Sequence, residues 1–132
     1  MKIEEHLRAL KESVEEIEDA ISKGSEKRQR TIGFHTSAGA VDMIEIILHK
    51  RKLIDPGFIV KHEWFNSDRK IKEKISFEFP AKSRIINLIK SIEKERNKLC
   101  YGRAKTQSIL SEVIQNFFKL KEIFEEGEYN EL

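Results

Sequence analysis

One segment of the sequence combines residues that can bind an anion or take part in acid–base chemistry. It runs from Arg96 to Gly102 and reads Arg-Asn-Lys-Leu-Cys-Tyr-Gly. An apolar stripe at helical spacing surrounds its start, formed by Ile85, Ile89, Ile92 and Leu99. Arg96 occupies the one place in that stripe where an aliphatic residue is expected. Because a guanidinium keeps its proton and is costly to bury unpaired, Arg96 is the first candidate functional residue. The alternative is an arginine whose stem packs while its head stays in water.

Positive charge is concentrated around this segment. The chain of 132 residues has a formal net charge of only +2, which excludes a strong general polyanion binder. Residues 94–105 nevertheless carry five Lys or Arg side chains against one Glu, while both ends of the chain are acidic. Lys98, Arg103 and Lys105 are therefore expected either to form a rim that attracts phosphate or to be ordinary solvated cations.

The other reactive side chains give weaker signals. Tyr101 could orient a phosphate or stack on a base, or it could be a packed aromatic with its hydroxyl tied down. A single cysteine, Cys100, excludes an intramolecular disulfide, fits a reducing cytosol and is expected to be structural. His62 has no Cys or His at metal-ligand spacing, so the sequence predicts no metal site and no cofactor.

Hydrophobic periodicity predicts the elements that position these residues. Four long helices are expected, over residues 2–23, 26–53, 80–100 and 104–126. The first carries an apolar stripe from Ile3 to Ile21, the second crowds small residues between Gly33 and Ala40, and Gly102 and Gly127 are expected to end the last two. The small residues predict close approach of another helix, since each helical glycine costs up to about 1 kcal/mol relative to alanine. Residues 128–132 are expected to form a frayed acidic tail.

Residues 54–79 are the least regular part of the chain and are predicted to form a lid or insert over one end of the bundle. Ser67 or Asp68 is expected to cap a short helix over Arg69–Ile75. The alternation of apolar and polar residues from Ile75 to Phe79 indicates a strand or an extended cover. Pro80 is expected in the first turn of the third long helix.

These elements predict an all-α, up-and-down bundle of four long helices, with residues 1–132 forming one domain. Hydrophobic residues make up 39% of the chain and charged residues 36%, which is enough apolar material for one core. The sequence has neither a run of about 18 apolar residues nor an apolar signal-peptide region. We therefore expect a cytoplasmic protein that does not contact a membrane.

The segment from Arg96 to Gly102 resembles the signature of the HEPN superfamily (higher eukaryotes and prokaryotes nucleotide-binding domain). That signature is an Arg, usually followed by Asn, then a His a few residues later, often before Gly, at the end of the third long helix of a helical bundle. Arg96, Asn97 and Gly102 match, whereas Tyr101 stands in place of the His. The resemblance covers nearly the whole chain and is weakest over residues 54–79.

The resemblance implies a homodimer in which Arg96 lies in a cleft, with Asn97 in a supporting role. It also implies a nucleotide, RNA or a minimal nucleotidyltransferase as partner, in a toxin–antitoxin setting. Active members resemble metal-independent ribonucleases that use the motif His. Because a phenol is a poor base near neutral pH, binding with weak or no catalysis is the leading hypothesis. The alternatives are a ribonuclease using Arg96 and Tyr101, and an assembly module that recruits a helix to the stripe from Ile3 to Ile21.

Overall fold

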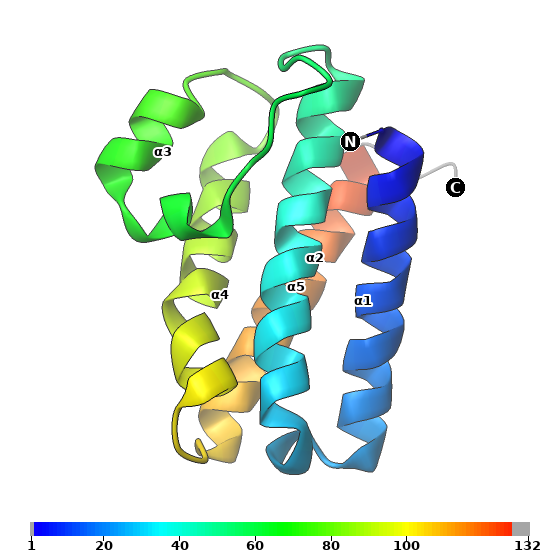
Figure 1. Ribbon diagram of the computed structural model, residues 1–132, viewed down its shortest axis with the longest axis vertical. Helices are drawn as coiled ribbons and strands as arrows, with labels where there is room; N and C mark the ends of the chain where they lie inside the picture. Colours follow the sequence, from blue (N-terminus) through cyan, green and yellow to red (C-terminus); the bar gives the residue numbers. More distant parts are fainter. Residues whose placement is uncertain (1, 128–132) are drawn as a thin grey trace.

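The computed structural model describes residues 2–127, which are all-helical and contain no strand. Figure 1 shows the four long helices side by side and alternating in direction. They are α1 (Ile3–Lys23), α2 (Gln29–Lys50), α4 (Lys82–Tyr101) and α5 (Gln107–Gly127). A fifth helix, α3 (Asp68–Lys74), is short. The expected all-α class is confirmed, but the chain has five helices in the described range where the sequence indicated four long ones.

Helix α2 is the centre of the fold, because it packs against α1, α4 and α5. It is buried on more than one face, and a helix in that position cannot keep a wide polar stripe. Its small residues allow close packing, as the sequence predicted. A Cβ at Gly33 would lie 2.6 Å from Cβ of Leu99 on α4, and one at Gly39 would lie 2.8 Å from the Phe117 ring on α5.

Helix α1 lies on α2 through a face that is shifted from the predicted apolar stripe. Its buried residues are His6, Leu10, Ser13, Ile17 and Ala20. Leu7 and Val14 of the stripe are half-buried, and Ile21 is 43% exposed. Small side chains meet there, since a Cβ at Gly39 of α2 would lie 3.4 Å from Cβ of Ser13 on α1.

Residues 54–79 cover the α2–α4 side of the molecule at one end (Figure 1). They contain a 3₁₀ helix, η2 (His62–Asn66), followed by α3, whose first turn is capped by Ser67 Oγ accepting from the Lys70 amide at 3.2 Å. The predicted short helix is thus confirmed with Ser67 as its cap. The strand alternative for Ile75–Phe79 is wrong, since no strand occurs within residues 2–127. The segment is held by its apolar side chains, with Trp64, Phe65, Ile71, Ile75 and Phe79 buried.

The start of α4 differs from the prediction. Pro80 precedes the helix, which begins at Lys82, and Ala81 takes a left-handed conformation with φ of 61°. The Lys82 amide donates to the Phe79 carbonyl at 3.2 Å, which closes a turn with Pro80 and Ala81 at its centre. The fixed φ of proline suits the second position of such a turn as well as a first helical turn, and the turn forms here.

The far ends of the long helices agree more closely with the sequence. Gly102 ends α4, and its amide donates to the Lys98 carbonyl at 2.9 Å. Helix α5 begins at Gln107, three residues later than predicted, and Gly127 is its last residue. The predicted acidic tail, residues 128–132, lies outside the described residues. None of the helices within residues 2–127 is long and apolar enough to cross a membrane.

Candidate functional site

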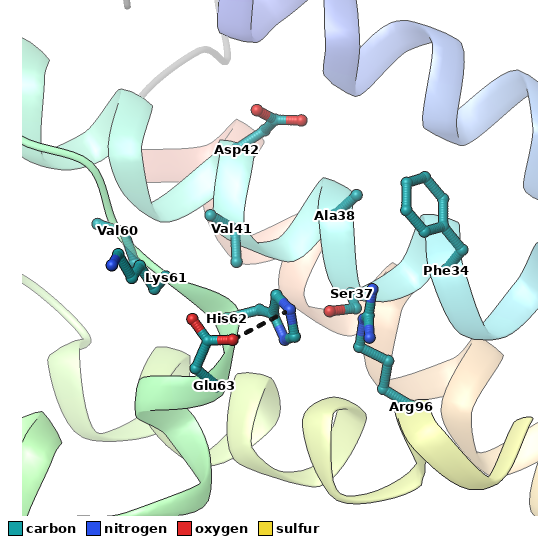
Figure 2. Close-up of a pocket in the computed structure, with 10 residues that line it drawn as sticks. All are labelled: Phe34, Ser37, Ala38, Val41, Asp42, Val60, Lys61, His62, Glu63 and Arg96. Atoms are coloured by element: carbon teal, nitrogen blue, oxygen red, sulfur yellow. Dashed lines mark ion pairs between the residues drawn. The ribbon is translucent and has the colours of Figure 1, made fainter. Parts of the chain in front are cut away.

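Arg96 lies in a cleft between α2, α4 and the segment that leads into η2 (Figure 2). We call this the Arg96 cleft. Its volume is about 480 Å³, and its lining residues are Phe34, Ser37, Ala38, Val41, Asp42, Val60, Lys61, His62, Glu63 and Arg96. Arg96, which takes the place of an aliphatic residue in the apolar stripe of α4, is thus half-buried and faces a concavity rather than the core.

The guanidinium of Arg96 is positioned by weak contacts. Its Cζ atom lies 5.9 Å from the centroid of the Phe34 ring, within the range of a cation–π contact. Its Nη1 atom lies 3.4 Å from Oδ1 of Asn97, at the outer limit of a hydrogen bond. Within residues 2–127 no carboxylate forms an ion pair with it. The arrangement leaves its hydrogen-bond donors available to an anion that enters the cleft.

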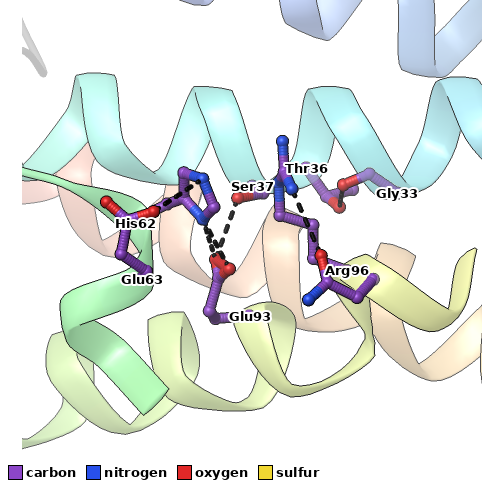
Figure 3. A network of polar contacts seen from close by, with 8 residues as sticks. Gly33, Thr36, Ser37, His62, Glu63, Glu93 and Arg96 are labelled. Atoms are coloured by element: carbon purple, nitrogen blue, oxygen red, sulfur yellow. Dashed lines mark hydrogen bonds and ion pairs between the residues drawn. The ribbon is translucent and has the colours of Figure 1, made fainter. Parts of the chain in front are cut away.

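A buried carboxylate lies one helical turn before Arg96 on the same face of α4. Glu93 is only 5% exposed and lies three positions before Arg96 in the sequence. Ser37 Oγ of α2 donates to Glu93 Oε2 at 3.1 Å, and His62 Nδ1 of η2 lies 2.7 Å from Glu93 Oε1 (Figure 3). These contacts compensate the burial of the carboxylate, and they fix the ring of His62 at the edge of the cleft.

His62 is therefore a candidate site residue that the sequence analysis did not select. Its Nε2 atom lies 3.6 Å from Oε2 of Glu63, so the two groups form an ion pair when the ring is protonated. The side chain of His62 is 34% exposed. Ser37 and Glu93 were missed as well. One signal was available in the sequence, because Glu93 lies at helical spacing from Arg96 on the apolar side of the same helix. The partner of Glu93 was not visible, since His62 is 31 residues away in the irregular segment.

The other predicted site residues do not line the Arg96 cleft. Tyr101 is 74% exposed and is not among the lining residues. It lies five positions after Arg96, so the two side chains point about 140° apart around the helix axis. Lys98 is exposed and lies 4.0 Å from Glu95 on its own helix. Asn97 is exposed, and its Oδ1 atom lies 3.4 Å from Nη1 of Arg96 at the edge of the guanidinium group. Burial raises the pKa of the Cys100 thiol, which fits the expected structural role.

Arg103 and Lys105 lie in the loop between α4 and α5, where Gln29 holds the backbone. Nε2 of Gln29 donates to the carbonyl of Arg103 at 3.0 Å and to that of Leu99 at 3.2 Å. Its Oε1 accepts from the Lys105 amide at 2.8 Å. The amide of one side chain thus ties α2 to this loop, beyond the end of α4 and away from the Arg96 cleft.

The cleft combines the groups that recognise a phosphate next to an aromatic base. Arg96 supplies a planar set of donors, and His62, Ser37 and Lys61 supply further polar groups on the same concavity. Phe34 is 48% exposed, so part of its ring is free to be covered. Asp42 and Glu63 add negative charge at other points of the lining. The lining therefore matches one phosphate with an attached ring, either free or as one unit of a longer chain, better than several phosphates in a row.

Comparison of the chain with protein-family models, with curated proteins and with solved structures finds no match.

Proposed function

We propose that this protein binds a nucleotide unit, free or within single-stranded RNA, in the Arg96 cleft. One observation carries the proposal: a half-buried arginine faces a cleft without an ion-pair partner among residues 2–127, beside the exposed ring of Phe34. Guanidinium groups bind phosphate through paired hydrogen bonds. Aromatic and guanidinium planes stack on unpaired bases. The two groups lie together in the cleft, which suits a phosphate joined to a base.

The HEPN resemblance supports the same proposal. Arg96 and Asn97 match the first two places of the signature, and the resemblance places them in a ligand cleft near the end of the third long helix. The homodimer, the minimal nucleotidyltransferase partner and the toxin–antitoxin setting belong to this proposal as well. In that assembly the Arg96 clefts of two protomers face one groove, and bound RNA spans both.

Replacing Arg96 with alanine is expected to weaken binding of a short fluorescent oligoribonucleotide by at least about tenfold, because a charge-assisted contact to phosphate is lost. Fluorescence anisotropy at several salt concentrations measures the effect, and the slope of log affinity against log salt should become shallower by about 0.7. Thermal unfolding should stay near that of the unchanged protein, since Arg96 has no ion pair to lose within the described residues.

Lys98→Ala is the matched control for this experiment. It removes a cation from the same helix, two residues away, without touching the cleft lining. Its affinity is expected to stay within about twofold of the unchanged protein. If both substitutions weaken binding equally, diffuse charge rather than the cleft binds the RNA, and the proposal fails.

A second candidate function is metal-independent RNA cleavage with His62 as the general base or acid. It is favoured by one observation: Nδ1 of His62 is tied to a buried carboxylate while the ring lies on the same cleft as Arg96. A base oriented by a carboxylate is a recurring arrangement in acid–base catalysis. The 2′-hydroxyl would lose its proton to the imidazole and attack the adjacent phosphorus. The P–O5′ bond would break as P–O2′ forms. The released 5′-oxygen would take a proton from water, and the imidazolium would return its proton to the solvent.

This candidate predicts RNA cleavage in the presence of a chelator, with 2′,3′-cyclic phosphate ends. We expect His62→Ala and Arg96→Ala each to reduce the rate by about a hundredfold or more, and Tyr101→Phe to leave it unchanged. Denaturing gel electrophoresis of labelled RNA measures the rates. If Tyr101→Phe abolishes cleavage and His62→Ala does not, the route through Tyr101 is correct. Absence of cleavage by purified protein removes both routes and leaves the binding proposal intact.

A further inference from the structure

A second group of titratable side chains lies between α1 and α2, near the end of the molecule that holds the N-terminus of α1. It consists of His6 from α1 with Asp42, Glu45 and His49 from α2, and we call it the His6 cluster. His6 is 5% exposed and Glu45 is 2% exposed. Glu45 and His49 are four residues apart, which places them on one face of α2. The proposed nucleotide site does not use His6, Glu45 or His49.

The contacts within the His6 cluster leave two ring nitrogens without a hydrogen bond. Nδ1 of His6 lies 2.7 Å from Oδ1 of Asp42. The amide of Val60 donates to Oε1 of Glu45, and Oε2 of Glu45 is in ion-pair contact with Nε2 of His6. That contact lacks hydrogen-bond geometry, so Nε2 of His6 is unsatisfied, as is the buried Nε2 of His49. The two imidazole rings stack with their centroids 6.0 Å apart.

We infer that the His6 cluster is a binding site for a divalent transition-metal ion of the Zn²⁺ type, with His6, Glu45 and His49 as ligands. One ligand atom from each of the three residues lies within 4.8 Å of the other two. Two imidazoles and one carboxylate form a known ligand set for zinc sites that keep an open fourth position. Imidazole ligands favour such an ion over Mg²⁺ or Ca²⁺, which prefer oxygen.

The surroundings of the cluster match those of a metal site. A metal-bound histidine usually gives the proton of its other ring nitrogen to a carboxylate, and Asp42 accepts from His6 in this way. The Val60 amide similarly holds Oε1 of Glu45, so that Oε2, which faces Nε2 of His6, is the oxygen placed to bind an ion. His49 is the least buried of the three ligands, and it lines a surface cleft of about 510 Å³ between the start of α1 and the segment that follows α2.

A proton competes with the metal for His6. Burial by itself would lower the pKa of His6, but the hydrogen bond of the ring to Asp42 and the close negative charges of Glu45 and Asp42 outweigh burial and raise it to about 9. Burial lowers the pKa of His49, with the charge of His6 acting in the same direction and that of Glu45 against it.

The test uses tag-free protein that has been stripped of metal with a chelator, which is then removed. Zn²⁺ binding to this protein is measured by isothermal calorimetry, and Co²⁺ binding is measured by visible absorption. We expect saturable binding of one equivalent and a tetrahedral-type Co²⁺ spectrum. His49→Ala should weaken binding at least about tenfold. This half-buried position has no hydrogen bond at Nε2 to lose, so the variant should fold, which thermal unfolding checks.

His35→Ala is the matched control, because His35 is a half-buried histidine on the same helix as His49, with a hydrogen bond to Ser13, and lies outside the His6 cluster. Unchanged affinity in this variant together with the loss in His49→Ala supports the site. The inference is overturned if no saturable binding occurs at micromolar metal, if His49→Ala binds as tightly as the unchanged protein, or if His35→Ala removes the binding. RNA binding does not enter this test, so its outcome is separate from that of the proposed function.

Discussion

Replacing Gly33 with alanine is expected to lower the free energy of unfolding by about 2–3 kcal/mol. A Cβ at this position would lie 2.6 Å from Cβ of Leu99 and 3.3 Å from the backbone nitrogen of Cys100. Both neighbours belong to α4 and are close to its helical backbone, so they cannot rotate away as the end of a long side chain can. Helices α2 and α4 must move apart, and the lost packing exceeds the gain of up to about 1 kcal/mol that alanine brings to an open helical position.

Chemical denaturation at neutral pH measures this effect, with two further glycines as references. Gly39→Ala meets the rim of the Phe117 ring at 2.8 Å, and a ring can tilt, so its loss should be smaller. Gly57→Ala meets nothing within 4 Å and should change stability by less than about 0.5 kcal/mol. A Gly33→Ala protein that is more stable than the parent would show that α2 and α4 do not approach as closely as described.

Raising the pH from 6.5 to about 9 is expected to remove about 3 kcal/mol from the free energy of unfolding. The pKa of His6 is raised from 6.5 in the unfolded chain to about 9 in the fold, so within this window the folded protein holds a proton that the unfolded chain has released. The contribution of His6 is complete below pH 6.5 and is lost as the pH rises through the folded pKa. The window begins at 6.5 because His49, with its lowered pKa, acts in the opposite direction below that point.

Urea unfolding at several pH values in the presence of a chelator measures this loss without interference from metal. His6→Gln is the control variant. Glutamine keeps hydrogen-bonding capacity toward Asp42 and Glu45 but does not titrate, so the decline with pH should largely disappear. Two results would show that the proton on His6 is not the cause of the pH dependence. One is a stability of the unchanged protein that does not vary with pH, and the other is an equally steep decline in His6→Gln.

The sequence by itself determined the helices and the most informative part of the Arg96 cleft. Apolar spacing located α1, α2, α4 and α5 because helical periodicity is a local property that a short window of sequence displays. Ser67 and Gly102 marked helix ends for the same reason. Arg96 was visible as a cation in an otherwise aliphatic stripe, and its place on the Arg96 cleft agrees with that reading.

Only the tertiary structure decided which side chains surround Arg96 and which face of α1 is buried. His62 meets Glu93 across 31 residues, and His6 meets Asp42 across 36. No local pattern encodes such pairs, because they depend on how the irregular segment and α1 are laid against α2. Tyr101, which the HEPN resemblance paired with Arg96, is directed elsewhere by the rotation of the helix. Periodicity is a property of neighbouring residues along one helix, whereas a site is formed by residues from several elements brought together by packing.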